Sequence, residues 1–324
     1  MSNLTRYEKL SICRTKLQVY TFCLLLSQKK TNSNFIFFID DNYNEANLQF
    51  LKRISDNTNV KYTYYVKKNV ISDLIVLLGF VNKYSCCEIY ISSVGNGYIS
   101  LMLGVLKYDS LITFDDGAAN LEKSSFVYIQ RNSFARKLFF MVFYKSKSLK
   151  QIVESSSIHF NIFPDFLYPV KGYFNNEVNI NLLFKSSNVG VKLGDFDCVF
   201  VAPCYEEYFN DPLEAYRKVI LFLNDKIREG FRLLYVSHPR SSFEIPQGLT
   251  PDKSLNEYLL EELIPSLYKE EKPLELIGFG NTTQAFFLSD DKVNITILSS
   301  VEVKEMYVNH FFSCYSGINR VALD

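Results

Sequence analysis

The chain has 324 residues, a length that suits two domains of roughly 150 residues each. Hydrophobic residues make up 48% and charged residues 22%, which excludes wholesale disorder and low-complexity architecture. Lys+Arg and Asp+Glu both number 35, so the net charge of zero argues against a dedicated nucleic-acid-binding protein. Seven cysteines without C-x-x-C spacing predict neither a disulfide framework nor a zinc site. No apolar run reaches the ~18 residues of a spanning helix, and we expect a cytoplasmic protein.

The first half alternates short apolar segments with helical patterns, the rhythm of parallel βαβ units. A helix is predicted over residues 17–27. Buried strands are predicted at residues 10–13, 35–39, 60–66, 88–92 and 111–114. The last of these strands runs directly into Asp115, Asp116 and Gly117.

The second half repeats this rhythm. Pro212 begins a predicted helix over residues 212–228, and Gly230 ends it. A further helix is predicted at about residues 255–267, and strands at residues 199–202, 232–236, 274–277 and 293–298, the last being the final strand expected. Residues 171–190, rich in Asn, Ser and Gly, predict a linker. We therefore expect an α/β fold of two doubly wound Rossmann-like domains, 1–175 and 190–324, facing a central cleft.

The first candidate for chemistry is the pair Asp115 and Asp116, where a strand should end. Two adjacent carboxylates repel each other, which raises the proton affinity of one of them. One of the pair could then act as a general base on a sugar hydroxyl. The alternative is a solvated turn, because Asp and Gly are common turn residues.

The second candidate is Ser237-His238-Pro239-Arg240, at the carboxyl end of a predicted strand. Pro239 would hold the His238 imidazole rigidly, where it could donate to a phosphate oxygen. Arg240 could add a bidentate phosphate contact. The alternative is a structural histidine.

The third candidate lies between a predicted strand and a short helix and consists of Gly278, Gly280, Asn281, Thr282 and Thr283. Small and hydroxyl residues at such a junction leave backbone N–H groups facing an anion. The alternative is an ordinary helix N-cap by Asn or Thr.

The fourth candidate is residues 131–150, which combine aromatic rings with six basic residues and no acidic one. The basic residues are Arg131, Arg136, Lys137, Lys145, Lys147 and Lys150. A basic and aromatic helix is typical of an anionic membrane surface. The alternative is an amphipathic helix whose rings enter the domain core.

Several segments together resemble the bacterial sialyltransferases of glycosyltransferase family 52, the lipooligosaccharide sialyltransferase group. The segments are Ile12-Cys13-Arg14-Thr15-Lys16-Leu17-Gln18, Thr113-Phe114-Asp115-Asp116-Gly117-Ala118-Ala119-Asn120, Ser157-Ile158-His159-Phe160, His238-Pro239 and the turn from Gly280 to Thr283. The related enzymes carry Ser-Ser or Ser-Thr where this chain has Asn281-Thr282-Thr283, so the turn is the weakest match.

The resemblance implies a GT-B fold that binds CMP-sialic acid mainly by the C-terminal domain and the acceptor sugar by the N-terminal domain. It implies inversion at the anomeric carbon without a metal or another cofactor. In this reading Asp115 is the base, Asp116 orients the loop or the acceptor sugar, and His238 assists CMP departure. The implied donor-binding residues are Gly117, Pro239, Arg240, Gly280, Asn281, Thr282 and Thr283, and the implied acceptor-binding residues are Arg14, Thr15, Gln18 and Asn120.

The function expected from this resemblance is transfer of sialic acid to a terminal galactose of a lipopolysaccharide, O-antigen or lipooligosaccharide acceptor through an α2,3 bond. The expected partners are CMP-sialic acid, a galactose-terminated glycolipid, an anionic inner-membrane surface and, as an assembly to be tested, a second copy in a homodimer. No nucleic-acid partner is expected. Two alternatives stay open, a GT-B enzyme that uses a nucleotide diphosphate sugar and a non-catalytic sugar- or nucleotide-binding protein.

Overall fold

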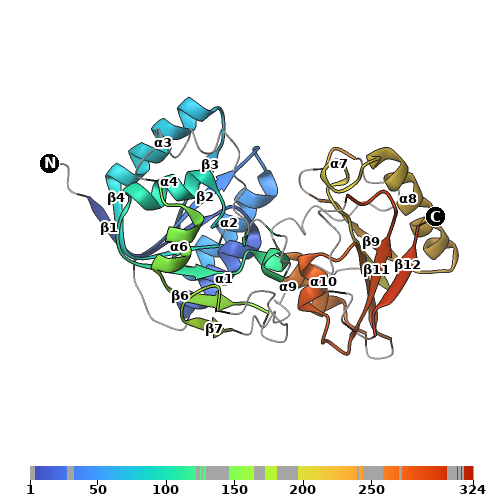
Figure 1. Ribbon diagram of the computed structural model, residues 1–324. Helices are drawn as coiled ribbons and strands as arrows, with labels where there is room; N and C mark the ends of the chain where they lie inside the picture. Colours follow the sequence, from blue (N-terminus) through green and yellow to red (C-terminus); the bar gives the residue numbers. More distant parts are fainter. Residues whose placement is uncertain are drawn as a thin grey trace. The chain divides into compact units, whose positions relative to one another are not determined.

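The structure is a computed structural model in which the chain forms two compact units, Met1–Leu182 and Leu183–Asp324. Figure 1 draws unit 1 from blue to green and unit 2 from yellow to red. The structure describes residues 4–27, 33–92, 94–121, 125, 127–128, 146–163, 172–180, 196–238, 241–243, 258–269, 272–304, 312, 315 and 317–323.

Unit 1 is built on a sheet whose seven strands pair in parallel in the order β3-β2-β1-β4-β5-β6-β7. The strands are β1 (Thr5–Cys13), β2 (Asn34–Asp40), β3 (Lys61–Val66), β4 (Tyr84–Ile91), β5 (Lys107–Phe114), β6 (Ser156–Asn161) and β7 (Glu177–Asn179). The helices are α1 (Lys16–Ser27), α2 (Glu45–Thr58), α3 (Val70–Lys83), α4 (Gly97–Val105) and α6 (Leu149–Ser155), with a 3-10 turn at Gly117–Leu121. Helix α1 packs on α2, and α3 packs on α4.

The central strands of unit 1 are buried on both faces, as expected for a parallel sheet between helices. Strand β2 buries six consecutive residues, Asn34 to Ile39. Its Phe35 ring stacks on Tyr7 of β1 and on Tyr84 at the start of β4. The asparagines that precede α2, α3 and α4 each accept a hydrogen bond from the first helical turn, which fixes where these helices begin.

Unit 2 is built on a parallel sheet of five strands in the order β12-β11-β10-β8-β9. The strands are β8 (Cys198–Val201), β9 (Leu233–Val236), β10 (Leu274–Gly278), β11 (Val293–Ser299) and β12 (Asn319–Ala322). The helices are α7 (Tyr205–Tyr208), α8 (Pro212–Arg228), α9 (Leu260–Leu263), which continues as a 3-10 turn (Ile264–Leu267), and α10 (Thr282–Phe286).

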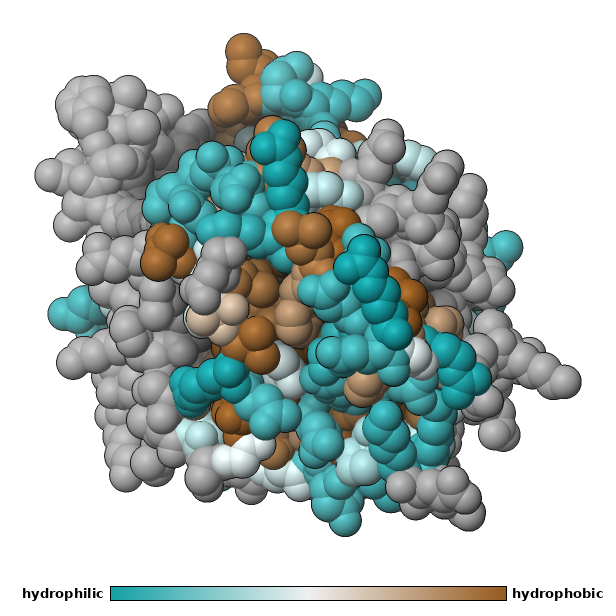
Figure 2. All heavy atoms as spheres, turned by 90° about the vertical axis from the view of Figure 1, so that its right-hand side faces the viewer, coloured by the Kyte–Doolittle hydropathy of each residue, from teal (hydrophilic) through white to brown (hydrophobic). Residues whose placement is uncertain are grey.

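Helix α8 shows how the sequence pattern positions an element of unit 2. The Asp211 side chain caps its first turn, and the helix buries Ala215, Val219 and Leu223 against the sheet. Its opposite side exposes Leu221, which is 65% exposed. This helix lies at the right of Figure 1, and Figure 2 turns that side toward the viewer, where hydrophobic residues are interspersed among hydrophilic ones.

The predicted strands and the helix over residues 212–228 are confirmed, with strand ends that shift by at most five residues. One expectation was wrong, because β12 follows the strand at residues 293–298, which is therefore not the last one. The boundary between the two units lies within residues 171–190, the stretch expected to be a linker, but this stretch also contains β7, which pairs with β6. Among the described residues, no helix has the length and apolar character to cross a membrane.

Candidate functional site

The carboxyl edge of the unit 1 sheet brings the segments after β1 and β5 together, at the side where ligands bind in such folds. Gln18, in the first turn of α1, accepts a hydrogen bond from the Arg14 N–H through its Oε1 at 2.6 Å. Its Nε2 donates to Oδ1 of Asp116 at 2.6 Å. Thr15 Oγ1 accepts from the Gln18 N–H at 3.3 Å. Gln18 therefore joins the predicted acceptor-sugar residues to the predicted carboxylate pair.

The loop that follows β5 is held in a fixed shape. Asn120 Oδ1 accepts from the Asp116 N–H at 2.7 Å, and its carbonyl accepts from the Tyr128 hydroxyl at 2.5 Å. Gly117 has a φ of 64°, in the left-handed region that favours glycine, where the chain turns into the 3-10 segment. The Asp-Asp-Gly motif thus forms a defined turn whose Asp116 side chain is partly exposed.

Asp115 is placed differently from its neighbour, because it is only 1% exposed. Its Oδ2 accepts from the Ile162 N–H at 2.7 Å, and its Oδ1 lies 3.2 Å from Nε2 of His159. The His159 ring, on β6, stacks on Phe174 with 3.7 Å between centroids and 3° between planes. His159 belongs to a segment of the family resemblance, but no role was predicted for it from the sequence.

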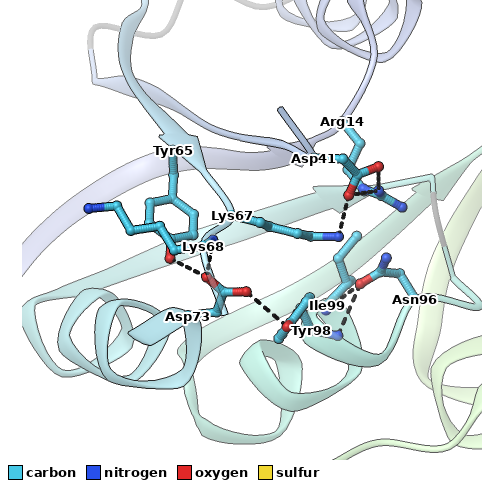
Figure 3. Close-up of polar contacts among 9 residues, drawn as sticks. All are labelled: Arg14, Asp41, Tyr65, Lys67, Lys68, Asp73, Asn96, Tyr98 and Ile99. Atoms are coloured by element: carbon cyan, nitrogen blue, oxygen red, sulfur yellow. Dashed lines mark hydrogen bonds and ion pairs between the residues drawn. The ribbon is translucent and has the colours of Figure 1, made fainter. Parts of the chain in front are cut away.

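A second polar group lies at the ends of the neighbouring strands β1, β2 and β3, shown in Figure 3. Arg14 donates to both carboxylate oxygens of Asp41 at 2.9 and 2.8 Å, and Lys67 Nζ lies 2.5 Å from the same carboxylate. The Phe35–Ile39 strand signal ends at Asp40 and Asp41, which is the sequence feature that could have found this carboxylate. The predicted acceptor-binding Arg14 is therefore part of a continuous polar strip along the sheet edge.

Figure 3 also shows Asp73, a buried carboxylate on α3. It accepts hydrogen bonds from Tyr65 at 2.6 Å, the Lys68 N–H at 2.9 Å and Tyr98 at 3.0 Å. Burial alone would raise the pKa of Asp73, but these hydrogen bonds and Lys67 outweigh burial and lower it. This carboxylate ties β3 and α3 to α4, so its contacts explain it as a structural group.

In unit 2, His238 follows β9 and is partly exposed. Its carbonyl accepts from the Ser241 N–H at 3.1 Å. Glu206 on α7 accepts from the Ser242 N–H at 2.6 Å, and from the Ser242 and Ser241 hydroxyls at 2.5 and 3.1 Å. Burial opposes ionisation of Glu206, but the hydrogen bonds from Ser242 outweigh it and lower its pKa to about 2. Glu206 thus anchors the segment that follows His238, whereas Pro239 and Arg240 lie outside the described residues.

The turn after β10 is organised by Gln284, whose side chain is completely buried. Its Nε2 donates to the Leu276 and Thr296 carbonyls at 3.1 and 2.9 Å. Its Oε1 accepts from the N–H groups of Gly280 and Asn281 at 2.9 and 3.3 Å. All four hydrogen-bonding positions of this amide are used, so Gln284 ties two strands to the turn.

The predicted donor-binding residues of this turn are also held by protein groups. Asn281 Oδ1 accepts from the Gln284 N–H at 2.9 Å and so caps α10. Thr283 donates to the buried Glu261 carboxylate at 2.7 Å. Gly280 has a φ of 80°, and Thr282 is partly exposed as the first residue of α10. The N-cap alternative considered from the sequence therefore describes Asn281.

The structure brings together only part of the predicted site. In unit 1, direct contacts connect Arg14, Thr15, Gln18, Asp116 and Asn120. In unit 2, the His238 segment follows β9 and the Gly280 turn follows β10, with β8 between these two strands. Sequence reasoning missed Glu206 and Gln284, because each acts through contacts with residues distant in the chain. Among the described residues, no group of three or more His, Cys, Asp and Glu side chains is arranged to hold a metal ion.

A comparison with protein families finds one match for this chain. The sequence model of glycosyltransferase family 52 matches residues 24–301. This range includes the Asp115–Asp116 pair, His159, His238 and the turn at residues 280–283. A comparison with curated proteins finds no match.

Proposed function

The chain belongs to glycosyltransferase family 52, a family of bacterial sialyltransferases, and we propose that it transfers sialic acid from CMP-sialic acid to a terminal galactose. The proposed acceptor is a lipopolysaccharide, O-antigen or lipooligosaccharide intermediate, and the proposed product carries an α2,3 bond. The observation that carries this proposal is the contact of Gln18 with both Arg14 and Asp116, because it joins the expected acceptor-sugar residues to an expected catalytic carboxylate.

The two units correspond in this proposal to the two domains of a GT-B enzyme. Unit 1 would bind the acceptor sugar and unit 2 the CMP-sugar. Both sheets are parallel, and each carries its candidate residues after the carboxyl ends of strands, which supports the assignment.

The reaction needs a base and a stabilised leaving group. The galactose hydroxyl oxygen attacks the anomeric carbon of sialic acid. A carboxylate of the Asp115–Asp116 pair takes the proton of this hydroxyl. The bond between that carbon and the phosphate oxygen breaks, and its electron pair leaves with CMP. Attack opposite the leaving group inverts the anomeric configuration. His238 donates to the departing phosphate, and the turn at residues 280–283 faces the nucleotide.

We propose that this reaction needs no metal ion. CMP carries a single phosphate, whose departing charge the His238 imidazole can stabilise by donating a hydrogen bond. Equal transfer rates with excess EDTA and with added Mg²⁺ would support this step, and loss of transfer in EDTA would contradict it.

The proposed location is the cytoplasmic face of the inner membrane, where the chain would attach peripherally. Residues 131–150 suggested this, but most of them lie outside the described residues. Helix α3 gives independent support, because Val70, Ile71, Ile75 and Val76 are 61, 72, 67 and 40% exposed. Lysines precede and end this helix, and its one acidic residue, Asp73, is buried. An apolar face with flanking cations suits an anionic lipid surface.

Incubation with CMP-sialic acid and a panel of galactosides, with the product linkage read by NMR, tests the proposed activity. Competition between CMP and UDP separates it from a glycosyltransferase that uses a nucleotide diphosphate sugar. Binding of CMP without turnover of any galactoside would instead favour a non-catalytic nucleotide-binding protein.

A further inference from the structure

A buried chain of hydrogen bonds runs from Ser156 through Thr113 and His159 to Asp115. It links the adjacent strands β5 and β6, on which Thr113 and His159 are partners in register. All four residues are at most 3% exposed. Because all four residues are buried, the position of each proton can be counted from the protein groups that they contact.

The count starts at Ser156, whose Oγ lies 2.9 Å from the Ile158 carbonyl oxygen. A carbonyl only accepts, so the single hydroxyl proton of Ser156 is used there. Thr113 Oγ1 must then donate to Ser156 Oγ, at 2.8 Å. With its only proton used, Thr113 can only accept from Nδ1 of His159, also at 2.8 Å. Nδ1 of His159 therefore carries a proton.

The other ring nitrogen, Nε2, faces Asp115 Oδ1 at 3.2 Å, and this contact needs one further proton between the two atoms. The pair is therefore either an imidazolium with a carboxylate or an imidazole with a carboxylic acid, and its net charge is zero in both forms. The Ile162 N–H on Oδ2 and the Phe174 ring stacked on the imidazole favour the ionised form.

The remaining groups near the pair come from several elements. Asp116 adjoins Asp115 in the loop after β5, and Glu177 of β7 is the register partner of His159. Burial, with smaller contributions from Asp115 and Glu177, raises the pKa of Tyr128, and burial also raises the pKa of Tyr173. Both phenols therefore stay neutral at physiological pH and add no charge beside the pair.

We propose that His159 is a positioning residue that holds Asp115 through one shared proton, and that Asp116 is the carboxylate that receives the proton of the acceptor sugar. The two Asp115 oxygens are engaged by His159 and Ile162, whereas Asp116 is partly exposed and accepts from the neutral amide of Gln18. This division of roles rests on the proposed sialyl transfer. It exchanges the roles expected from the sequence.

The test compares two isosteric variants, Asp115→Asn and Asp116→Asn, in the full chain. In Asp115→Asn the new amide can donate to a neutral imidazole and keep the contact with His159. In Asp116→Asn the side-chain oxygen still accepts from Gln18, but the group can no longer take a proton. Single-turnover transfer should fall by ~100-fold or more in Asp116→Asn and by less than that in Asp115→Asn.

A second readout follows the ring nitrogens of His159 by ¹⁵N NMR, which is practical because the chain has three histidines. The wild type should show protons on both ring nitrogens, and Asp115→Asn should show a neutral ring protonated at Nδ1. A merely structural histidine would not change its protonation with this substitution. A wild-type ring protonated at Nε2 alone would overturn the proton count.

Two results separate failure of this inference from failure of the proposed function. A folded Asp115→Asn variant that loses as much activity as Asp116→Asn, or more, would overturn the assignment of the base. A wild-type chain that transfers no sialic acid to any galactoside would overturn the proposed function and, with it, the role of Asp116. In either case, the ¹⁵N spectrum of the His159 ring shows whether His159 and Asp115 share a proton.

Discussion

Replacing Gln284 by Met should destabilise unit 2 although the two side chains have similar lengths. The change removes four hydrogen bonds, to the Leu276 and Thr296 carbonyls and from the Gly280 and Asn281 N–H groups. Each bond contributes ~1 kcal/mol net, and the thioether recovers part of the loss by burial, so we expect a cost of about 3 kcal/mol. For a unit of this size, that cost lowers the melting temperature by roughly 10 °C.

The assay is calorimetric unfolding of the full chain, together with titration of CMP at a temperature where the variant is folded. We expect CMP affinity to fall, because the turn at residues 280–283 loses the amide that holds it. Gln49→Met on α2 is the control, since Gln49 Nε2 donates an exposed hydrogen bond to Glu45 Oε1 at 3.5 Å. A Gln284→Met melting temperature as close to wild type as that of Gln49→Met would refute the reasoning.

Gly278 offers an independent check of the same packing. A Cβ at this position would lie 2.6 Å from Asn281 Nδ2 and 2.8 Å from Gln284 Oε1, closer than real side chains allow. Gly278→Ala should therefore destabilise unit 2 as well. Its cost should shrink when Gln284 is also changed to Ala, because the conflicting Gln284 atoms are then removed and only the Asn281 amide remains close. Strict additivity of the two changes would mean that Gln284 is not the neighbour that requires glycine here.

Three further predictions concern His238, acid stability and the membrane. His238→Ala should lose most single-turnover activity with little change in melting temperature, whereas a destabilised but fully active variant would remove His238 from the mechanism. The pKa of Glu206 lies at about 2, below its ordinary 4.5, so its contribution to stability is present above pH 4.5 and is lost as the pH falls toward 2. Denaturant unfolding across this range should therefore show a shallower decline for Glu206→Gln than for wild type, and equal slopes would contradict the prediction. The double variant Ile71→Glu with Ile75→Glu should abolish flotation with anionic liposomes at low salt. The control variant Leu221→Glu on α8 should still float. Retained flotation of the double variant would exclude α3 as the membrane contact.

Hydrophobic patterning predicted the strands of this chain because parallel strands between two helical layers are nearly continuous apolar runs. Strand β6 was not predicted, since four of the six residues in its sequence Ser-Ser-Ile-His-Phe-Asn are polar. Two of those polar side chains, Ser156 and His159, are buried because they bond to Thr113 across the sheet. Strand β7 was not predicted from hydrophobic patterning either, since it has three residues, all exposed. Its place at the sheet edge comes from pairing with β6, which local sequence does not encode.

The same limit applies to the candidate site. Motifs at strand ends found Asp115, Asp116 and His238, because topology alone puts such positions at one edge of a parallel sheet. They could not rank the two aspartates, which are identical in type and adjacent in sequence. The difference arises from alternation along the chain at the end of β5, which turns Asp115 inward toward His159 and leaves Asp116 at the surface beside Gln18.

That alternation has a consequence for how the motif works. A carboxylate that is both buried and ionised needs a compensating charge, and in this chain the nearest candidate is an imidazole whose proton is fixed from behind by Thr113 and Ser156. The two hydroxyls are therefore as much a part of the motif as the aspartates, because they decide which ring nitrogen carries the proton. Thr113→Val would remove this constraint while keeping the shape of the side chain, and would free His159 to become a neutral donor to an ionised Asp115. The pair would then carry a full negative charge next to Asp116, which would raise the proton affinity of the exposed carboxylate and shift the acidic limb of the rate profile toward higher pH.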